Sequence, residues 1–152
     1  MQDIGNLENT EPITIVDYGM GNISSIKNMI KKIGGTSIFS RDKDIILNSS
    51  KIILPGVGAF DAGMQSLKEA GIDKAIITSA ENGSTILGIC LGFQLLFEES
   101  EEGEMNGLGL IKGKVKKFIN RPHIRVPHMG WNIIKPESDS ILFDKSNEIP
   151  LR

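Results

Sequence analysis

The segment Gly88–Gly92 (GICLG) holds the only cysteine of the chain, Cys90, in a setting that suits a nucleophile. The apolar residues before it predict the end of a strand, and the spacing of Phe93–Phe97 after it predicts a helix. A sharp turn from strand to helix needs unusual backbone angles and close backbone approach, which flanking glycines allow. The amide of Leu91 would then point toward an oxyanion. The alternative is a buried cysteine that packs as a small hydrophobe.

Apolar runs alternate with helical patterns along most of the chain. The pattern predicts strands at 13–16, 36–39, 51–54 and 85–89, and helices at 23–33, from residue 60 onward, and around 75–77. Such alternation predicts an α/β fold, a parallel sheet with helices on both faces. Ligand sites of these folds gather at the carboxyl ends of the strands.

Three glycine-containing turns follow predicted strands, namely Gly19–Asn22, Pro55–Gly58 and Gly88–Gly92. They are expected to meet at one edge of the sheet, and this convergence favours a reactive Cys90. The two glycines around Val57 would let a peptide N–H serve as a second oxyanion donor, although an ordinary turn explains the segment alone. Gln94 lies one helical turn after Cys90, facing the same cleft or simply solvent.

The second half of the chain has a different pattern from about Gly107 onward. Segments 113–118 and 131–134 predict strands of a more antiparallel, partly exposed region, with a turn at Arg121-Pro122 between them. The acidic run 98–102 is interpreted as a solvated helix end and loop.

The sequence gives weaker evidence for several other functional sites. The Gly19–Asn22 turn resembles a dinucleotide fingerprint, but Ser24 occupies the place of the third glycine, so no cofactor is expected. His123 and His128 are the candidate acid–base partners of the thiol, and neither has an orienting carboxylate nearby, which favours structural roles. Trp131 could anchor an interface or fill a core. No spacing of His, Cys, Asp or Glu predicts a metal site.

Composition limits the function classes. The chain has 152 residues with a net charge of −2, which predicts one domain and gives no indication of nucleic acid or an anionic membrane as a partner. One cysteine cannot form an internal disulfide. The polar start, residues 1–12, is unlike a secretory signal, and no apolar run is long enough to span a membrane, so a cytoplasmic protein is expected.

Four segments together resemble a known family. They are 15–22 (IVDYGMGN), 54–60 (LPGVGAF), 88–96 (GICLGFQLL) and 127–132 (PHMGWN). They resemble the HisH-type glutaminase subunits of imidazole glycerol phosphate synthase, which are class I, triad-type glutamine amidotransferases. The resemblance implies a three-layer flavodoxin-like fold, with a leader at 1–12 followed by an amidotransferase domain at 13–152.

The resemblance also implies roles for individual residues. Cys90 would attack the carboxamide of L-glutamine, and backbone amides of Leu91 and of Val57-Gly58 would hold the oxyanion. Gly56 and Gln94 would bind the glutamine. Ammonia would pass to a (β/α)8-barrel synthase of the HisF type, with no cofactor, for the synthesis of imidazole glycerol phosphate and an aminoimidazole carboxamide ribotide. The positions that match the partner-facing region of the family are Asn22, Met129, Trp131 and Asn132.

The family's catalytic His-x-Glu pair is absent from these 152 residues. The sequence therefore predicts a domain that is incomplete at its C-terminal end and lacks the last strands. The missing pair leaves a partner-binding module with weak or no catalysis as one alternative. The acidic run 98–102 leaves a second, a paralogue with the same glutaminase chemistry that supplies ammonia for surface-sugar modification. A third alternative is a redox-sensing or deglycase-like protein with a similar cysteine elbow.

Overall fold

The computed structural model describes residues 11–119, together with residues 130 and 133. The chain divides into two compact units, Met1–Lys117 and Phe118–Arg152. The fold described below is that of the first unit.

Four short apolar strands form a parallel sheet in the order β2-β1-β3-β4. The strands are β1 (Ile13–Val16), β2 (Ser37–Ser40), β3 (Lys51–Leu54) and β4 (Thr85–Gly88). The register pairs Ile15 with both Phe39 and Ile53, and Leu54 with Gly88. The predicted parallel α/β fold is confirmed, and the carboxyl ends of the strands share one edge.

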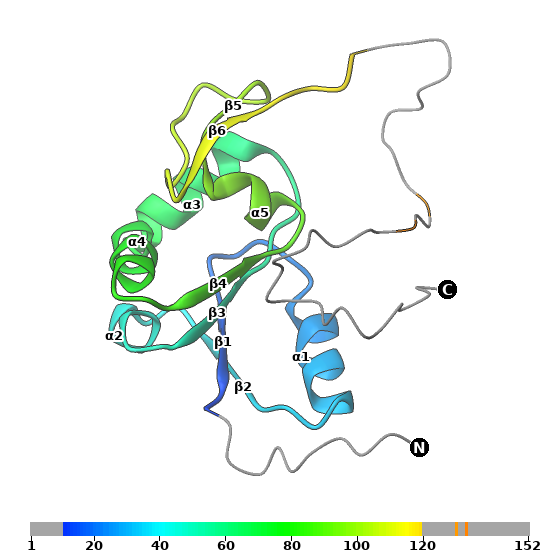
Figure 1. Cartoon of the computed structure of the whole chain (residues 1–152), viewed down its shortest axis with the longest axis vertical. Helices are drawn as coiled ribbons and strands as arrows, with labels where there is room; N and C mark the ends of the chain where they lie inside the picture. The colour runs from blue at the N-terminus through cyan, green and yellow to red at the C-terminus, as the bar shows by residue number, and fades with distance from the viewer. Residues whose placement is uncertain (1–10, 120–129, 131–132, 134–152) are drawn as a thin grey trace. The chain divides into compact units, whose positions relative to one another are not determined.

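In the part of the chain that the structure describes, five helices cover the two faces of this sheet. They are α1 (Ile23–Lys32), α2 (Lys43–Leu47), α3 (Phe60–Ala70), α4 (Asp73–Glu81) and α5 (Leu91–Leu95). Helix α1 lies on one face, and α2 to α5 lie on the opposite side (Figure 1). The contacts α2–α4, α3–α4 and α3–α5 join the helices of that second layer.

The alternation of side chains along the strands produces two cores. Ile15 and Ile53 pack with Ile30 of α1 on one face. Val16, Ile52 and Leu54 project to the other face, where they join the buried side chains of the larger helical layer. Because side chains alternate along a strand, consecutive apolar residues are buried on both faces, as a parallel sheet between helices requires.

Helix α1 covers only the centre of its face. Phe39 and Leu87 pair in register with Ile15 and Ile53, so their side chains lie on the α1 face. They remain 44% and 40% exposed, respectively. The outer strands of the sheet are therefore thinly covered on this side within the described residues.

Polar caps define where the first two helices begin. The side chain of Asn22 accepts a hydrogen bond from the Ser25 amide at the start of α1, and Asp42 caps α2 in the same way. The sequence analysis did not predict α2, although Asp42 was the signal for it. A helix of five residues has too few apolar positions to show a periodicity.

Two further strands pair with each other as a small separate sheet. Strands β5 (Phe97–Ser100) and β6 (Ile111–Val115) run parallel to each other. The antiparallel arrangement predicted for 113–118 and 131–134 stays a prediction. Glu98 and Glu99 are exposed in β5 rather than in a helix end. The physical reason is the intervening loop, which returns the chain to the start of β5, where the Gly107 amide donates to the Glu98 carbonyl at 2.8 Å. The strand predicted at 131–134 lies outside the described residues, apart from the exposed Ile133.

The side chain of Asp61, in helix α3, binds the loop between β5 and β6. Its carboxylate accepts hydrogen bonds from the amides of Glu104 and Met105, both at 3.0 Å. These two backbone donors lower the pKa of Asp61 from its ordinary value. A Cβ at Gly103 would lie 2.0 Å from the carboxylate, so only glycine allows the loop to approach this closely.

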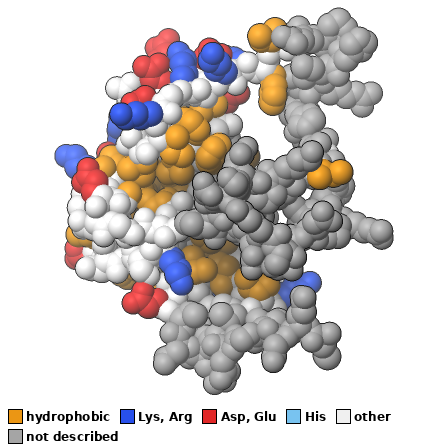
Figure 2. All heavy atoms as spheres, viewed as in Figure 1, with side chains coloured by type: hydrophobic (Ala, Val, Ile, Leu, Met, Phe, Trp, Pro, Cys, Tyr) orange, Lys and Arg blue, Asp and Glu red, His pale blue; other side chains and the backbone are white. Residues whose placement is uncertain are grey.

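The surface of the described part carries mixed charge. Figure 2 shows Lys, Arg, Asp and Glu side chains interspersed along the left and upper margin of this face, with apolar side chains gathered inward of them. Within the residues that the structure describes, no helix is both long and apolar enough to cross a membrane.

Adjacent isoleucines in α2 give a matched test of the larger core. Ile46 is fully buried, whereas Ile45 is 41% exposed. We expect Ile46→Ala to lower the free energy of unfolding by about 2–5 kcal/mol and Ile45→Ala by clearly less, because only the first substitution leaves a cavity. Urea unfolding followed by circular dichroism measures both. Equal losses would contradict the packing described here.

The Asp61 contacts predict an acid-sensitive loop. Since the folded pKa lies below the unfolded one, the stabilisation is complete above the unfolded value of about 3.9 and is lost as the pH falls through the folded pKa. Hydrogen exchange should show the Glu104 and Met105 amides protected at neutral pH and progressively less so in acid. In Asp61→Asn the protection should be weak throughout, and full protection in that variant would exclude this role of the carboxylate.

Candidate active site

Cys90 occupies a strained turn between β4 and α5. Its φ of 54° makes it the one non-glycine residue with positive φ among the described residues. The side chain is exposed, while the carbonyl accepts hydrogen bonds from the amides of Phe93 and Gln94 at 3.0 and 3.2 Å. Side chains rarely adopt such backbone angles, and where they do the surrounding structure must impose them. The predicted buried alternative for Cys90 is therefore excluded by its exposure.

Two glycines allow the turn to be this tight. A Cβ at Gly92 would lie 1.8 Å from the Leu54 carbonyl oxygen, and a Cβ at Gly88 would lie 2.4 Å from the Phe93 Cα. The same Leu54 oxygen accepts a hydrogen bond from the Ile89 amide at 2.9 Å. The first turn of α5 therefore lies directly against the end of β3.

The turn 55–58 lies beside this elbow, as the sequence predicted. Gly56 is buried against it, since a Cβ there would lie 2.8 Å from the Gly92 nitrogen and 2.9 Å from the Leu91 Cβ. Val57 and Gly58 are exposed, and Gly58 has a φ of 115°. Among the described residues, the amides of Val57, Gly58 and Leu91 find no acceptor. Three N–H groups near Cys90 are thus available to a ligand.

The turn 17–22 contacts the turn 55–58 from the neighbouring strand. A Cβ at Gly58 would lie 2.8 Å from the Met20 methyl group, and one at Gly21 would lie 3.0 Å from the Pro55 Cβ. Asp17 holds the start of this turn, because its carboxylate accepts from the Gly19 amide and from the guanidinium of Arg41. All three predicted turns therefore meet at the carboxyl edge of the sheet.

The remaining predicted site residues are only partly described. Gln94 is half-buried one helical turn after Cys90, and Asn22 is exposed at the start of α1. Met129, Trp131 and Asn132 lie outside the described residues. So do the candidate acid–base residues, which are His123 and His128.

The sequence analysis missed one buried residue at the site. The Tyr18 hydroxyl donates a hydrogen bond to the Pro55 carbonyl at 2.5 Å. Burial, and to a smaller extent the neighbouring Cys90, raise the pKa of Tyr18 well above its ordinary value, so the hydroxyl keeps its proton. Its position in the segment 17–22, between Asp17 and Gly19, was the available signal, but its acceptor lies 37 residues away.

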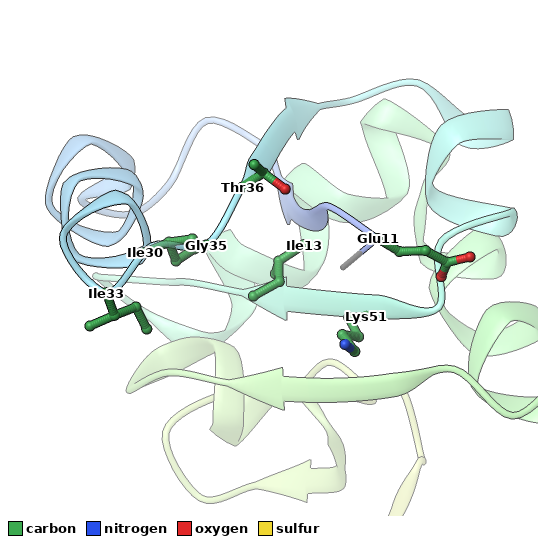
Figure 3. A pocket seen from close by; sticks show the side chains of 7 residues that line it. All are labelled: Glu11, Ile13, Ile30, Ile33, Gly35, Thr36 and Lys51. Atoms are coloured by element: carbon green, nitrogen blue, oxygen red, sulfur yellow. The ribbon is translucent and has the colours of Figure 1, made fainter. Parts of the chain in front are cut away.

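Figure 3 shows a pocket whose lining residues do not include Cys90. Its volume is about 160 Å³, and it is lined by Glu11, Ile13, Ile30, Ile33, Gly35, Thr36 and Lys51. Ile13 and Lys51 are the first residues of β1 and β3, whereas the elbow follows the last residue of β4. In the described ranges, no group of three or more His, Cys, Asp or Glu side chains could hold a metal ion.

Comparison with known proteins agrees with this geometry. Residues 15–129 match the CobB/CobQ-like glutamine amidotransferase domain. A solved structure described as a glutamine amidotransferase superposes with a TM-score of 0.59 at 25% identity, covering 68% of this chain and 55% of that one. The fold and the cysteine elbow define a class I glutamine amidotransferase domain.

The curated relatives are more specific. Imidazole glycerol phosphate synthase subunit HisH 2 of Methanococcus maripaludis is 51% identical over 81% of this chain and 61% of its own length. The HisH subunit of Bacillus licheniformis is 45% identical over 90% of this chain and 66% of its own. That of Oceanobacillus iheyensis is 43% identical, over 91% and 68%. The chain belongs to the HisH family and spans about three fifths to two thirds of the length of these relatives.

Close approach of the elbow to β3 yields a test of the site's architecture. Gly92→Ala would place a methyl group against the Leu54 carbonyl, and we expect a loss of about 3 kcal/mol or more in unfolding free energy. Gly83→Ala is the control, because Gly83 has a φ of 94° but open space around it. Its cost should be about 1–2 kcal/mol, from backbone strain alone. Thermal unfolding compares the two, and a milder effect at Gly92 than at Gly83 would refute the close approach.

Proposed function

We propose that this chain is the nucleophile-bearing portion of a HisH-type glutaminase subunit that hydrolyses L-glutamine and passes ammonia to a HisF-type (β/α)8-barrel synthase. The observation that carries the proposal is the exposed Cys90, held at positive φ beside three amides that have no acceptor within the described part of the chain. The match of residues 15–129 to a glutamine amidotransferase domain supports the same chemistry.

The proposed reaction has two steps. The Cys90 sulfur attacks the side-chain carboxamide carbon of glutamine, its proton reaches the amide nitrogen through a base, and the C–N bond breaks to release ammonia. Water then attacks the thioester carbonyl, which frees glutamate and restores the thiol. Glutamine and water are thus converted into glutamate and ammonia.

The described residues suit the charge that develops in both steps. Each attack places negative charge on the carbonyl oxygen, and the amides of Leu91, Val57 and Gly58 are the proposed donors to it. Leu91 begins α5 directly after Cys90, and Val57 and Gly58 lie in the turn that follows β3. Gln94 and Gly56 are the proposed contacts to the bound glutamine.

The base is not supplied by a His-x-Glu pair within these 152 residues, since neither histidine is followed two positions later by Glu. General acid–base catalysis typically contributes about 100- to 10,000-fold. We therefore propose that the chain alone turns over slowly. Partner contacts are proposed at Asn22, Met129, Trp131 and Asn132, the positions that the family resemblance marks, and a reducing cytoplasmic location fits a single exposed thiol.

Ammonia release tests this function directly. The chain is mixed with a HisF-type synthase and its ribonucleotide ligand, and ammonia from L-glutamine is measured with Cys90→Ala as control. We expect release that depends on Cys90 and falls to background in the variant, since the covalent intermediate cannot form without the sulfur. Complex formation is followed in parallel by gel filtration.

The same experiment separates the two leading functions. No release from a complex that still forms would replace the glutaminase by a docking module. Release that persists in Cys90→Ala would exclude Cys90 as the nucleophile.

A further inference from the structure

Tyr18 stands at the contact between the two turns that surround Cys90. Its side chain is 5% exposed and its hydroxyl donates to the Pro55 carbonyl. A Cβ on Gly56 would lie 2.5 Å from the Tyr18 oxygen, so the phenol fits directly under the 55–56 peptide. Among the described residues, the Tyr18 hydroxyl is the one donor to this carbonyl.

The turn 55–58 has a fixed half, Pro55-Gly56, and a free half, Val57-Gly58. Pro55 and Gly56 are buried and are held by Tyr18 and by the elbow. Val57 and Gly58 are exposed, and their amides have no acceptor among the described residues. A peptide unit is planar, so fixing the Pro55 carbonyl also fixes the direction of the Gly56 N–H and the starting point of the free half.

We propose that Tyr18 is a positioning residue, one that sets the orientation of the 55–58 turn so that its free amides can donate to the oxyanion formed at Cys90. This inference rests on the proposed glutaminase function. Tyr18 does not contact the substrate in this proposal, because its hydroxyl already donates to the Pro55 carbonyl. Its high pKa means that the phenol remains a donor over the whole working pH range.

Two reagents distinguish an effect on the position of the oxyanion amides from an effect on the exposure of the Cys90 thiol. A chloroketone analogue of L-glutamine reacts through an alkoxide at its carbonyl and therefore needs oxyanion donors, whereas iodoacetamide alkylates the sulfur directly. The labelling rates of Cys90 by both reagents are measured by mass spectrometry on the full chain in complex with the synthase.

In Tyr18→Phe we expect ketone labelling to fall by about tenfold. This is less than the ~100- to 1,000-fold that follows the loss of a whole oxyanion donor, because the amides are misplaced and not removed. Iodoacetamide labelling should change by less than about twofold, because it needs no such donor. Ser79→Ala is the matched control, since its buried hydroxyl also donates to a backbone carbonyl, that of Ile46, away from the elbow. It should leave the ratio of the two rates unchanged.

Three results would overturn the proposal. Unchanged ketone labelling in Tyr18→Phe would show that the hydroxyl does not position the turn. An equal slowing with both reagents, or the same ratio change in Ser79→Ala, would show a general structural effect. Wild-type labelling that does not distinguish the L- from the D-analogue would overturn the glutaminase function itself, and the Tyr18 role with it.

A second measurement tests the proposal without a substitution, in case Tyr18→Phe does not fold. Tyr18 is the single tyrosine of the chain, so 3-fluorotyrosine gives one fluorine signal. We expect this signal to shift when Cys90 is labelled by the ketone and to remain in place after iodoacetamide. A signal that responds to neither reagent would contradict the coupling between Tyr18 and the oxyanion turn.

Discussion

The contact between the first turn of α5 and the end of β3 is the constraint on which the site depends. The Leu54 carbonyl lies where a side chain at Gly92 would have to be, and the buried Gly56 lies against the Gly92 amide. Glycines on both sides of this contact let two backbones touch without intervening side chains. Because both segments leave rigid parallel strands, the thiol and the neighbouring amides are placed by the sheet rather than by flexible side chains.

The two edges of the sheet consequently differ in character. The carboxyl edge gathers three glycine-containing turns whose backbone amides are partly unpaired, and this suits a reaction in which charge develops on an oxygen. The amino edge has a pocket lined by three isoleucines together with Glu11, Gly35, Thr36 and Lys51. In a parallel sheet this difference follows from where the strands turn into helices.

Local patterns in the sequence were sufficient to predict the parallel sheet and the tight turn at Cys90. Runs such as Ile13–Val16 and Lys51–Leu54 predict buried strands, and glycines around one cysteine predict a tight turn wherever they occur. The direction of β6 was not predictable, because it depends on a loop that Asp61 fastens from 43 residues away. Tyr18 was missed for the same reason, since its hydrogen bond to Pro55 joins two strands that only the fold brings together.

The positive φ of Cys90 has a consequence for the stability of the molecule. A non-glycine residue in such a conformation costs about 1–3 kcal/mol, and glycine would remove most of that cost. Stability alone therefore favours glycine at position 90, in a segment where glycine already occupies positions 88 and 92. Cys90 therefore carries a conformational cost, at a solvent-exposed position, that glycine would largely avoid.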